Sequence, residues 1–176
     1  MIERIIIAGA GGQGIMLLGK VLAEAVMREN KYVTWFPSYG AEVRGGTAYC
    51  MVVISSQEIG SPYIDKADTL IIMNEPALMR FKNRIKNKGL LVMNSSLANK
   101  NIKQNARILK YPFTDIAAKL GNLKVANIVA LGCYLNNKKI VSTNSVIQAI
   151  EEIAPEDKKD LIDINKQALK EGLALE

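Results

Sequence analysis

The stretch IIIAGAGGQGIMLLGK, residues 5–20, limits what this chain can fold into more than any other part of its sequence. Branched apolar residues typical of a buried strand run directly into a glycine-rich segment, and apolar residues at helical spacing follow it. Four of the six residues from 9 to 14 are glycines. A strand that enters a helix through such a turn is the first half of a βαβ unit. The stretch therefore predicts an α/β fold.

The rest of the chain continues this alternation of strands and helices. Short runs rich in branched residues predict strands at 2–8, 32–36, 47–55, 69–73, 90–94 and 106–110. Helical spacing predicts helices at 15–28, from Pro76 to near Gly89, and at 113–120, 125–135 and 144–153, with a last amphipathic helix opening at Pro155. Asn74 is the expected N-cap of the second helix. We predict one domain, residues 1–176, with a Rossmann-like, mostly parallel twisted sheet, helices on both faces and further helices at the C-terminus.

Residue types that carry out chemistry are scarce. The chain has no histidine and only two cysteines, Cys50 and Cys133, which lie far apart within apolar runs. We therefore predict buried thiols, no metal site and no catalytic residue in this chain. No apolar run is long enough to predict a membrane span, and the N-terminal MIERIII is unlike a signal peptide. These features favour a cytoplasmic protein.

Positive charge is concentrated in one segment. The formal net charge is +6, and residues 76–109 hold eight basic residues and no acidic one. The simplest interpretation is an exposed, solvated helix and loop, and the alternative is a face that meets an anionic partner. Phe81 is the only aromatic residue in this segment, which argues against a nucleic-acid site built on stacked bases. We expect no nucleic-acid partner.

The first glycine turn is suited to a phosphate. In a strand-to-helix turn of this type, Gly9 would permit the tight turn, and Gly14 would let the helix pack closely on its strand. Gly11 or Gly12 would let a ligand approach the main chain. The free N–H groups at the helix N-terminus favour a pyrophosphate. A turn that binds no ligand is the alternative, and the absence of a following Gly-Lys-Ser/Thr excludes a P-loop.

NAD fits this turn less well than other phosphate-bearing cofactors. A Rossmann NAD site has an acidic residue at the end of its second strand, where the residue binds the ribose hydroxyls. The sequence has TWFP, residues 34–37, at that place. A stand-alone Rossmann oxidoreductase that uses NAD or FAD is therefore the weaker hypothesis.

A second glycine-rich loop, PSYGAEVRGG at 37–46, is expected beside the first. Ligands of open α/β sheets bind where the carboxyl ends of the strands meet, and this loop follows the second strand. Ser38 and Tyr39 offer hydroxyl groups, and Arg44 offers a planar pair of donors for phosphate or carboxylate. The alternative is the entry of a hairpin with an exposed arginine.

Five motifs stand in order along the chain: GAGGQG at 9–14, PSYGAEVRGG at 37–46, GSP at 60–62, DTLIIMNEPAL at 68–78 and ANIVALG at 126–132. In this combination they resemble the gamma subunit of the 2-oxoacid:ferredoxin oxidoreductases, and the likeness runs from about residue 5 to residue 152. The small subunit of indolepyruvate oxidoreductase is similar and is kept as an alternative.

The resemblance implies a non-catalytic subunit of a multi-subunit enzyme. Such enzymes oxidatively decarboxylate a 2-oxoacid, here expected to be 2-oxoglutarate or pyruvate, and transfer the acyl group to coenzyme A. The implied partners are alpha and beta type subunits that hold thiamine diphosphate, and a ferredoxin-like subunit with iron–sulfur clusters. Ferredoxin or a similar acceptor would take the electrons through the complex. The chain alone would be inactive.

The resemblance also implies which residues of this chain contact coenzyme A. The glycine turn would face the phosphates, a residue of the following helix would add charge, and the second loop would line the cleft towards the thiamine site. The residues so implied are Gly9, Gly11, Gly12, Gln13, Gly14, Lys20, Ser38, Tyr39, Gly40, Arg44, Gly45 and Gly46.

Overall fold

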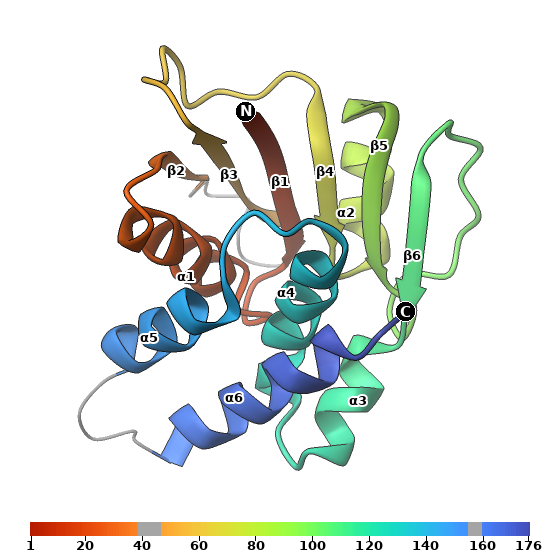
Figure 1. Ribbon diagram of the computed structural model, residues 1–176. Helices are drawn as coiled ribbons and strands as arrows, with labels where there is room; N and C mark the ends of the chain where they lie inside the picture. The colour runs from red at the N-terminus through yellow and green to blue at the C-terminus, as the bar shows by residue number, and fades with distance from the viewer. Residues whose placement is uncertain (39–46, 155–159) are drawn as a thin grey trace.

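A six-stranded sheet forms the centre of the computed structural model, which describes residues 1–38, 47–154 and 160–176 (Figure 1). The strand order is β2-β3-β1-β4-β5-β6. Five strands run in one direction and β3 runs in the other, because its pairings with β1 and β2 are antiparallel while the other pairings are parallel. The strands are β1 (Ile2–Ala10), β2 (Tyr32–Ser38), β3 (Thr47–Ser55), β4 (Ala67–Ile72), β5 (Ile85–Asn94) and β6 (Arg107–Tyr111). The predicted mostly parallel sheet is confirmed.

The helices lie on both faces of this sheet, as predicted, but unequally. Figure 1 shows α2 behind the sheet and the other helices in front of it. Alternate residues of β1 serve the two faces: Ile5 and Ile7 belong to the larger core beneath α1 and α4, and Ile6 and Ala8 to the smaller core beneath α2. The helices are α1 (Ile15–Arg28), α2 (Glu75–Phe81), α3 (Phe113–Lys119), α4 (Ala126–Asn137), α5 (Thr143–Ile153) and α6 (Asp160–Leu173).

The second predicted helix is shorter than expected. Asn74 caps α2 as predicted, because its Oδ1 accepts the N–H of Ala77 at 3.0 Å. The helix ends at Phe81, however, and a single 3-10 turn, η2 (Lys82–Arg84), leads directly into β5. The prediction of helix up to Gly89 was wrong because Ile85 is buried in the smaller core and pairs with Ala67. Tertiary packing outweighed the local pattern.

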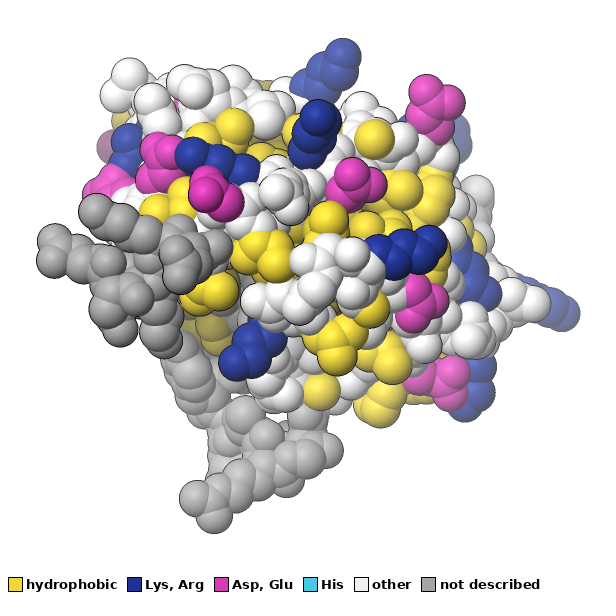
Figure 2. Space-filling model, turned by 90° about the horizontal axis from the view of Figure 1, so that it is seen from below, with side chains coloured by type: hydrophobic (Ala, Val, Ile, Leu, Met, Phe, Trp, Pro, Cys, Tyr) yellow, Lys and Arg dark blue, Asp and Glu magenta, His cyan; other side chains and the backbone are white. Residues whose placement is uncertain are grey.

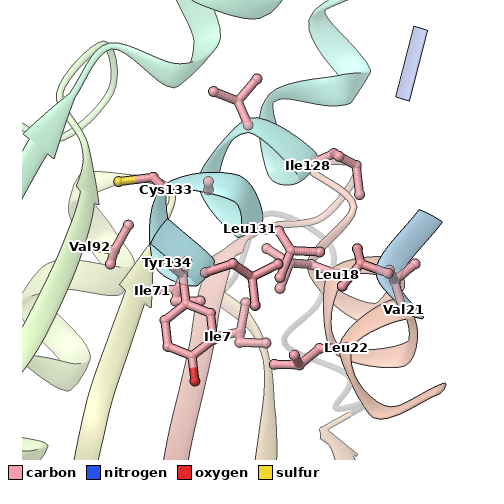
Figure 3. Packing of buried hydrophobic residues seen from close by; sticks show 14 of the residues in the cluster. Ile7, Leu18, Val21, Leu22, Ile71, Val92, Ile128, Leu131, Cys133 and Tyr134 are labelled. Carbon is pink, nitrogen blue, oxygen red and sulfur yellow. The ribbon is translucent and has the colours of Figure 1, made fainter. Parts of the chain in front are cut away.

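The motif ANIVALG forms the start of α4, which is buried almost completely. Figure 3 shows Tyr134 and Leu131 of this helix directed towards Ile7 and Ile71 of the sheet. The other side of α4 meets α6 through two glycines. A Cβ on Gly172 would overlap the carbonyl oxygen of Val129 and would lie 2.9 Å from the Cα of Gly132. The role of this motif in the fold is therefore close packing of two helices.

The carboxylate of Glu29 stabilises the start of α5. Its Oε1 accepts the N–H of Ser142 at 2.6 Å and the hydroxyl of Ser145 at 2.9 Å, and its Oε2 lies 2.8 Å from Nζ of Lys31. Burial alone would raise the pKa of Glu29, but these hydrogen bonds outweigh it and lower the pKa to about 2. The ionised form of Glu29 therefore contributes to the free energy of unfolding.

This arrangement predicts a loss of stability in acid. Because the folded pKa of Glu29 lies below its usual value of 4.5, the contribution is complete above about pH 4.5 and falls as the pH approaches 2. Because solvent screens this partly exposed carboxylate and its ion pair with Lys31, the loss should be about 1 to 2 kcal/mol. Denaturant unfolding between pH 7 and pH 2 measures it. Glu29→Gln should unfold more easily at pH 7 and should lack this part of the pH dependence, whereas Glu58→Gln, on an exposed turn, should match the parent chain. An unaltered pH dependence in Glu29→Gln would contradict the assignment.

None of the helices in the described part of the chain is long and apolar enough to cross a membrane.

Candidate functional site

The glycine turn joins the carboxyl end of β1 to the N-terminus of α1. The two positive φ angles of the turn are 87° at Gly12 and 69° at Gly14, which only glycine adopts readily. Gly9 lies inside β1 and does not make the turn, contrary to its predicted role. A Cβ on Gly9 would lie 2.6 Å from Oε1 of Gln13, so this glycine makes room for a neighbouring side chain.

The side chain of Gln13 holds the turn in place. Its Oε1 accepts the N–H of Ala10 at 2.7 Å, and its Nε2 donates to the carbonyl oxygen of Met73 at 3.4 Å. Met73 follows β4, so the amide of Gln13 links the ends of the two parallel strands β1 and β4. The family resemblance implied Gln13 as a ligand contact, and in the structure both ends of its amide bind the protein.

Asn127 is a part of the site that the sequence analysis missed. It is 1% exposed, and its Nδ2 donates to the carbonyl oxygen of Gly14 at 3.0 Å. A Cβ on Gly14 would overlap this Nδ2 and would lie 2.9 Å from Cγ of Asn127. The close approach predicted at Gly14 therefore exists, but it is made to α4 and not to β1. A lone asparagine in the apolar run ANIVALG was the available signal.

The N-terminus of α1 is open to a cavity of about 360 Å³. Its N-cap is Gly14, which has no side chain to cap the helix, and its first turn has no acidic residue. Unpaired N–H groups and the positive end of the helix dipole therefore remain available to an anion. The cavity is lined by Ala10, Gly11, Gly12, Gly14, Ile15, Met16, Leu17, Ser38 and Ala48.

Ser38 lies at this cavity although β2 is not the neighbour of β1. Strand β3 lies between the two, with Ser38 paired to Tyr49 and Ala10 paired to Thr47. Since β1 and β2 run in the same direction, their carboxyl ends share one edge of the sheet. The prediction that the start of the second loop lies near the glycine turn is confirmed for Ser38.

The remaining predicted contacts are Lys20 and five residues of the second loop. Lys20 is exposed on the second turn of α1 and does not line the cavity. Five residues of the second loop lie outside the described residues: Tyr39, Gly40, Arg44, Gly45 and Gly46.

The thiols are buried, as predicted from sequence. Burial raises the pKa of Cys50 and of Cys133 to about 12, so both are protonated and neither is a ready nucleophile. Across residues 1–38, 47–154 and 160–176, no group of three or more histidine, cysteine or carboxylate side chains is arranged to hold a metal ion. The described lining of the cavity at the N-terminus of α1 offers a ligand backbone amides and the hydroxyl of Ser38.

Part of the basic segment is paired within the chain. Nζ of Lys86 lies 2.5 Å from Oδ1 of Asp68, and Nζ of Lys100 lies 2.8 Å from Oε1 of Glu75. Arg84 donates to the carbonyl oxygens of residues 64 and 65 and lies over the ring of Tyr63. These contacts favour a structural role for several of the charges. Docking of an acidic partner on this segment stays a prediction.

A family comparison identifies the type of chain that carries this site. The family model described as pyruvate ferredoxin/flavodoxin oxidoreductase matches residues 4–175. The chain belongs to this family. The resemblance found in the sequence motifs is therefore confirmed across almost the whole chain.

Relatives in this family include subunits of three kinds of 2-oxoacid oxidoreductase. The chain is 34% identical over 169 residues to the ketoisovalerate oxidoreductase subunit VorA of Methanothermobacter marburgensis, a match that covers 96% of this chain and 35% of that protein. The chain thus spans about a third of that relative. It is 36% identical over 172 residues to the 2-oxoglutarate synthase subunit KorC of Methanocaldococcus jannaschii, with 94% and 92% of the two chains covered. A pyruvate synthase subunit, PorC of M. marburgensis, is 29% identical over 150 residues.

Solved structures of the pyruvate ferredoxin/flavodoxin oxidoreductase family share the fold. The gamma subunit of a keto/oxoacid ferredoxin oxidoreductase from Geobacter sulfurreducens superposes with a TM-score of 0.84 at 29% identity, with 97% and 95% of the two chains covered. The 2-oxoglutarate:ferredoxin oxidoreductase of Magnetococcus marinus, solved with 2-oxoglutarate, coenzyme A and succinyl-CoA bound, gives a TM-score of 0.89 at 24% identity. That match covers 99% of this chain and 31% of the other, and it shows the fold alone. The full-length matches correspond to gamma-type and C-type subunits.

Proposed function

We propose that this chain is the gamma subunit of a 2-oxoacid:ferredoxin oxidoreductase and helps to bind coenzyme A. In this proposal, alpha and beta type subunits hold thiamine diphosphate, a ferredoxin-like subunit holds iron–sulfur clusters, and ferredoxin or a similar acceptor receives the electrons. The 2-oxoacid is 2-oxoglutarate or pyruvate, and the chain is inactive without its partners. Relatives named as subunits of 2-oxoglutarate and pyruvate synthases support this assignment.

The observation that carries the proposal is the open N-terminus of α1 above a glycine turn. Three residues of the turn, Gly11, Gly12 and Gly14, line the cavity beside it and have no side chain that could fill it. The helix dipole and the uncapped N–H groups stabilise negative charge at this place. A pyrophosphate satisfies both features. A fold neighbour with coenzyme A bound makes coenzyme A the pyrophosphate to test first.

The predicted contacts divide into three roles. Backbone N–H groups of Gly11, Gly12 and Gly14 bind the phosphates. Gly9 and Gln13 set the shape of the turn through the contacts described above. Side chains of β2 and the second loop complete the site, namely Ser38, Tyr39 and Arg44, with Gly40, Gly45 and Gly46 as the glycines of that loop. Lys20, which does not line the cavity, contributes only its charge from the surface of α1.

The test is Gly11→Val in the assembled oxidoreductase. A branched side chain at this position would occupy space in the cavity where the ligand is proposed to lie. We expect the coenzyme A concentration at half-maximal acceptor reduction to rise about 10-fold or more. Decarboxylation of the 2-oxoacid without coenzyme A should be unaffected, because that step belongs to the thiamine site.

Gly60→Val is the matched control. Gly60 is exposed, and a Cβ there meets no described atom within 4 Å. This variant should assemble and show the coenzyme A dependence of the parent. A folded and assembled Gly11→Val enzyme with unaltered coenzyme A dependence would leave the turn without a ligand role.

A further inference from the structure

Gly12 separates two cavities of different chemistry. The first is the cavity at the N-terminus of α1. The second, here named the switch crevice, has a volume of about 190 Å³ and is lined by Gly12, Gln13, Met73, Leu97, Thr114, Leu123, Lys124 and Ala126.

The switch crevice lies between the carboxyl ends of β1 and β4. The chain leaves β1 for α1 on the front face of the sheet and leaves β4 for α2 behind it (Figure 1). Such a change of direction opens a crevice between two neighbouring parallel strands, and ligands of open α/β sheets bind there. The first cavity is on the opposite side of the turn, towards β3, because Ala48 of that strand lines it.

The described linings of the two cavities differ in charge. The described lining of the first cavity contains no basic side chain. Lys124 lines the switch crevice from the 3-10 turn η3 (Leu123–Val125). The backbone of this turn is held by Asn122, whose Oδ1 accepts the N–H of Lys124 at 3.0 Å. No partner for Nζ of Lys124 occurs in the described part of the chain. The crevice therefore has a cation at its edge that the described part of the chain does not neutralise.

A hydroxyl donor also faces the switch crevice. Oγ1 of Thr114 accepts a hydrogen bond from Nδ2 of the fully buried Asn94 at 2.8 Å. Because Oγ1 already accepts from this amide, the hydroxyl hydrogen of Thr114 is available to a ligand. Lys124 and Thr114 together can bind an anionic or strongly polar group.

Apolar walls complete the crevice. Leu97 is 45% exposed and Leu123 is 61% exposed, so both offer apolar surface that a ligand in the crevice can cover. Figure 2, which views the molecule from the end to which β1 and β4 point, shows hydrophobic side chains at the surface between separate basic ones. A flat ring can pack between such walls while an attached phosphate reaches a cation.

We propose that the switch crevice binds the 3′-phosphorylated adenosine end of coenzyme A, and that the pantetheine arm lies in the first cavity. This inference rests on the proposed function. The ligand then crosses Gly12 at its pyrophosphate, in contact with the N-terminus of α1. In the opposite orientation the 3′-phosphate would lie on the far side of Gly12 from Lys124 and Thr114, and these two side chains would have no anionic group to bind.

The test compares coenzyme A with 3′-dephospho-coenzyme A on the assembled oxidoreductase, by calorimetric titration and by acceptor reduction. The parent enzyme should bind coenzyme A about 5- to 10-fold more tightly than the dephosphorylated form, since a partly exposed charge pair is replaced by solvent. Lys124→Gln should remove most of this difference by weakening coenzyme A while leaving the dephosphorylated form within about twofold. Lys119→Gln, on the exposed last turn of α3, should bind both ligands as the parent does.

The outcomes separate this inference from the proposed function. If Lys124→Gln weakens both ligands equally, or neither, the crevice does not hold the 3′-phosphate and the inference is wrong. Gly11→Val should weaken both ligands whether or not the crevice is assigned correctly, so its result tests the proposed function alone. Leu123→Asp is a second probe, because a carboxylate at the mouth of the crevice should repel coenzyme A more than the dephosphorylated form. Equal effects on the two ligands would again reject the crevice.

Discussion

Gly172→Val should destabilise the chain by about 3 kcal/mol, the largest effect we expect of a single substitution in its helical layer. Its new Cβ would overlap the carbonyl oxygen of Val129 and approach the Cα of Gly132 to 2.9 Å. Both obstacles are backbone atoms of α4, which cannot move aside as a flexible side chain would. Relief requires α6 to move away from α4, and that movement would expose Ala168 and Leu169, which are now buried.

Thermal unfolding measures this effect. For a chain of this size, about 3 kcal/mol corresponds to a fall of about 10 °C in the midpoint. Gly60→Val introduces the same side chain into open space and should move the midpoint little. Glu171→Ala, an exposed change in the same turn of α6, tests whether any change in that turn is harmful. A midpoint for Gly172→Val equal to that of either control would mean that the two helices are not held together at these glycines.

Local sequence patterns predicted most of the fold, because each depends on nearby residues. The bounds of α1 match the prediction, and so do those of β3, since their apolar periodicities agree with the sides that they bury. The cap at Asn74 was also predictable, because the hydrogen bond to Ala77 spans only three residues. What could not be predicted was the end of α2, which is decided by the pairing of Ile85 with a strand eighteen residues away in sequence.

Strand order was harder to predict because it is a non-local property. The Rossmann expectation led us to place the end of the second strand beside the glycine turn, and Ser38 does lie there. It reaches that position by a different arrangement, with β3 inserted between β1 and β2. Ser38 still lies at the same edge of the sheet as the glycine turn, because β2 runs in the same direction as β1.

The site was predictable where backbone conformation determines it, and not where distant side chains do. Glycines at 12 and 14 signalled positive φ angles, and both have them. By contrast, the partners of Gln13 and Gly14 are Met73 and Asn127, which lie 60 and 113 residues away in sequence. No local pattern specifies such contacts. Lys124 likewise could not be predicted as a site residue from the sequence, because only the folded chain brings it near the glycine turn.

Gly14→Ala should destabilise the chain by about 2 to 4 kcal/mol, and most of that cost should depend on Asn127. Two effects combine at this position. An alanine must adopt a φ of 69°, which costs about 1 kcal/mol, and its Cβ must displace the amide of Asn127 from the carbonyl oxygen that it binds. Gly12→Ala isolates the first effect, because its φ is 87° and no described atom lies within 4 Å of its Cβ.

A double-mutant cycle separates the two effects. In an Asn127→Ala background the overlap is absent, so Gly14→Ala should cost only about 1 kcal/mol there, close to the cost of Gly12→Ala in the parent chain. Denaturant unfolding of the four proteins of the cycle gives the coupling energy, which we expect to be about 1 to 3 kcal/mol. Costs that simply add would show that Asn127 does not hold the turn. A double mutant that loses less stability than the sum of the two single changes would instead establish that α4 positions the N-terminus of α1, and that the glycine turn is shaped from outside the βαβ unit whose sequence first revealed it.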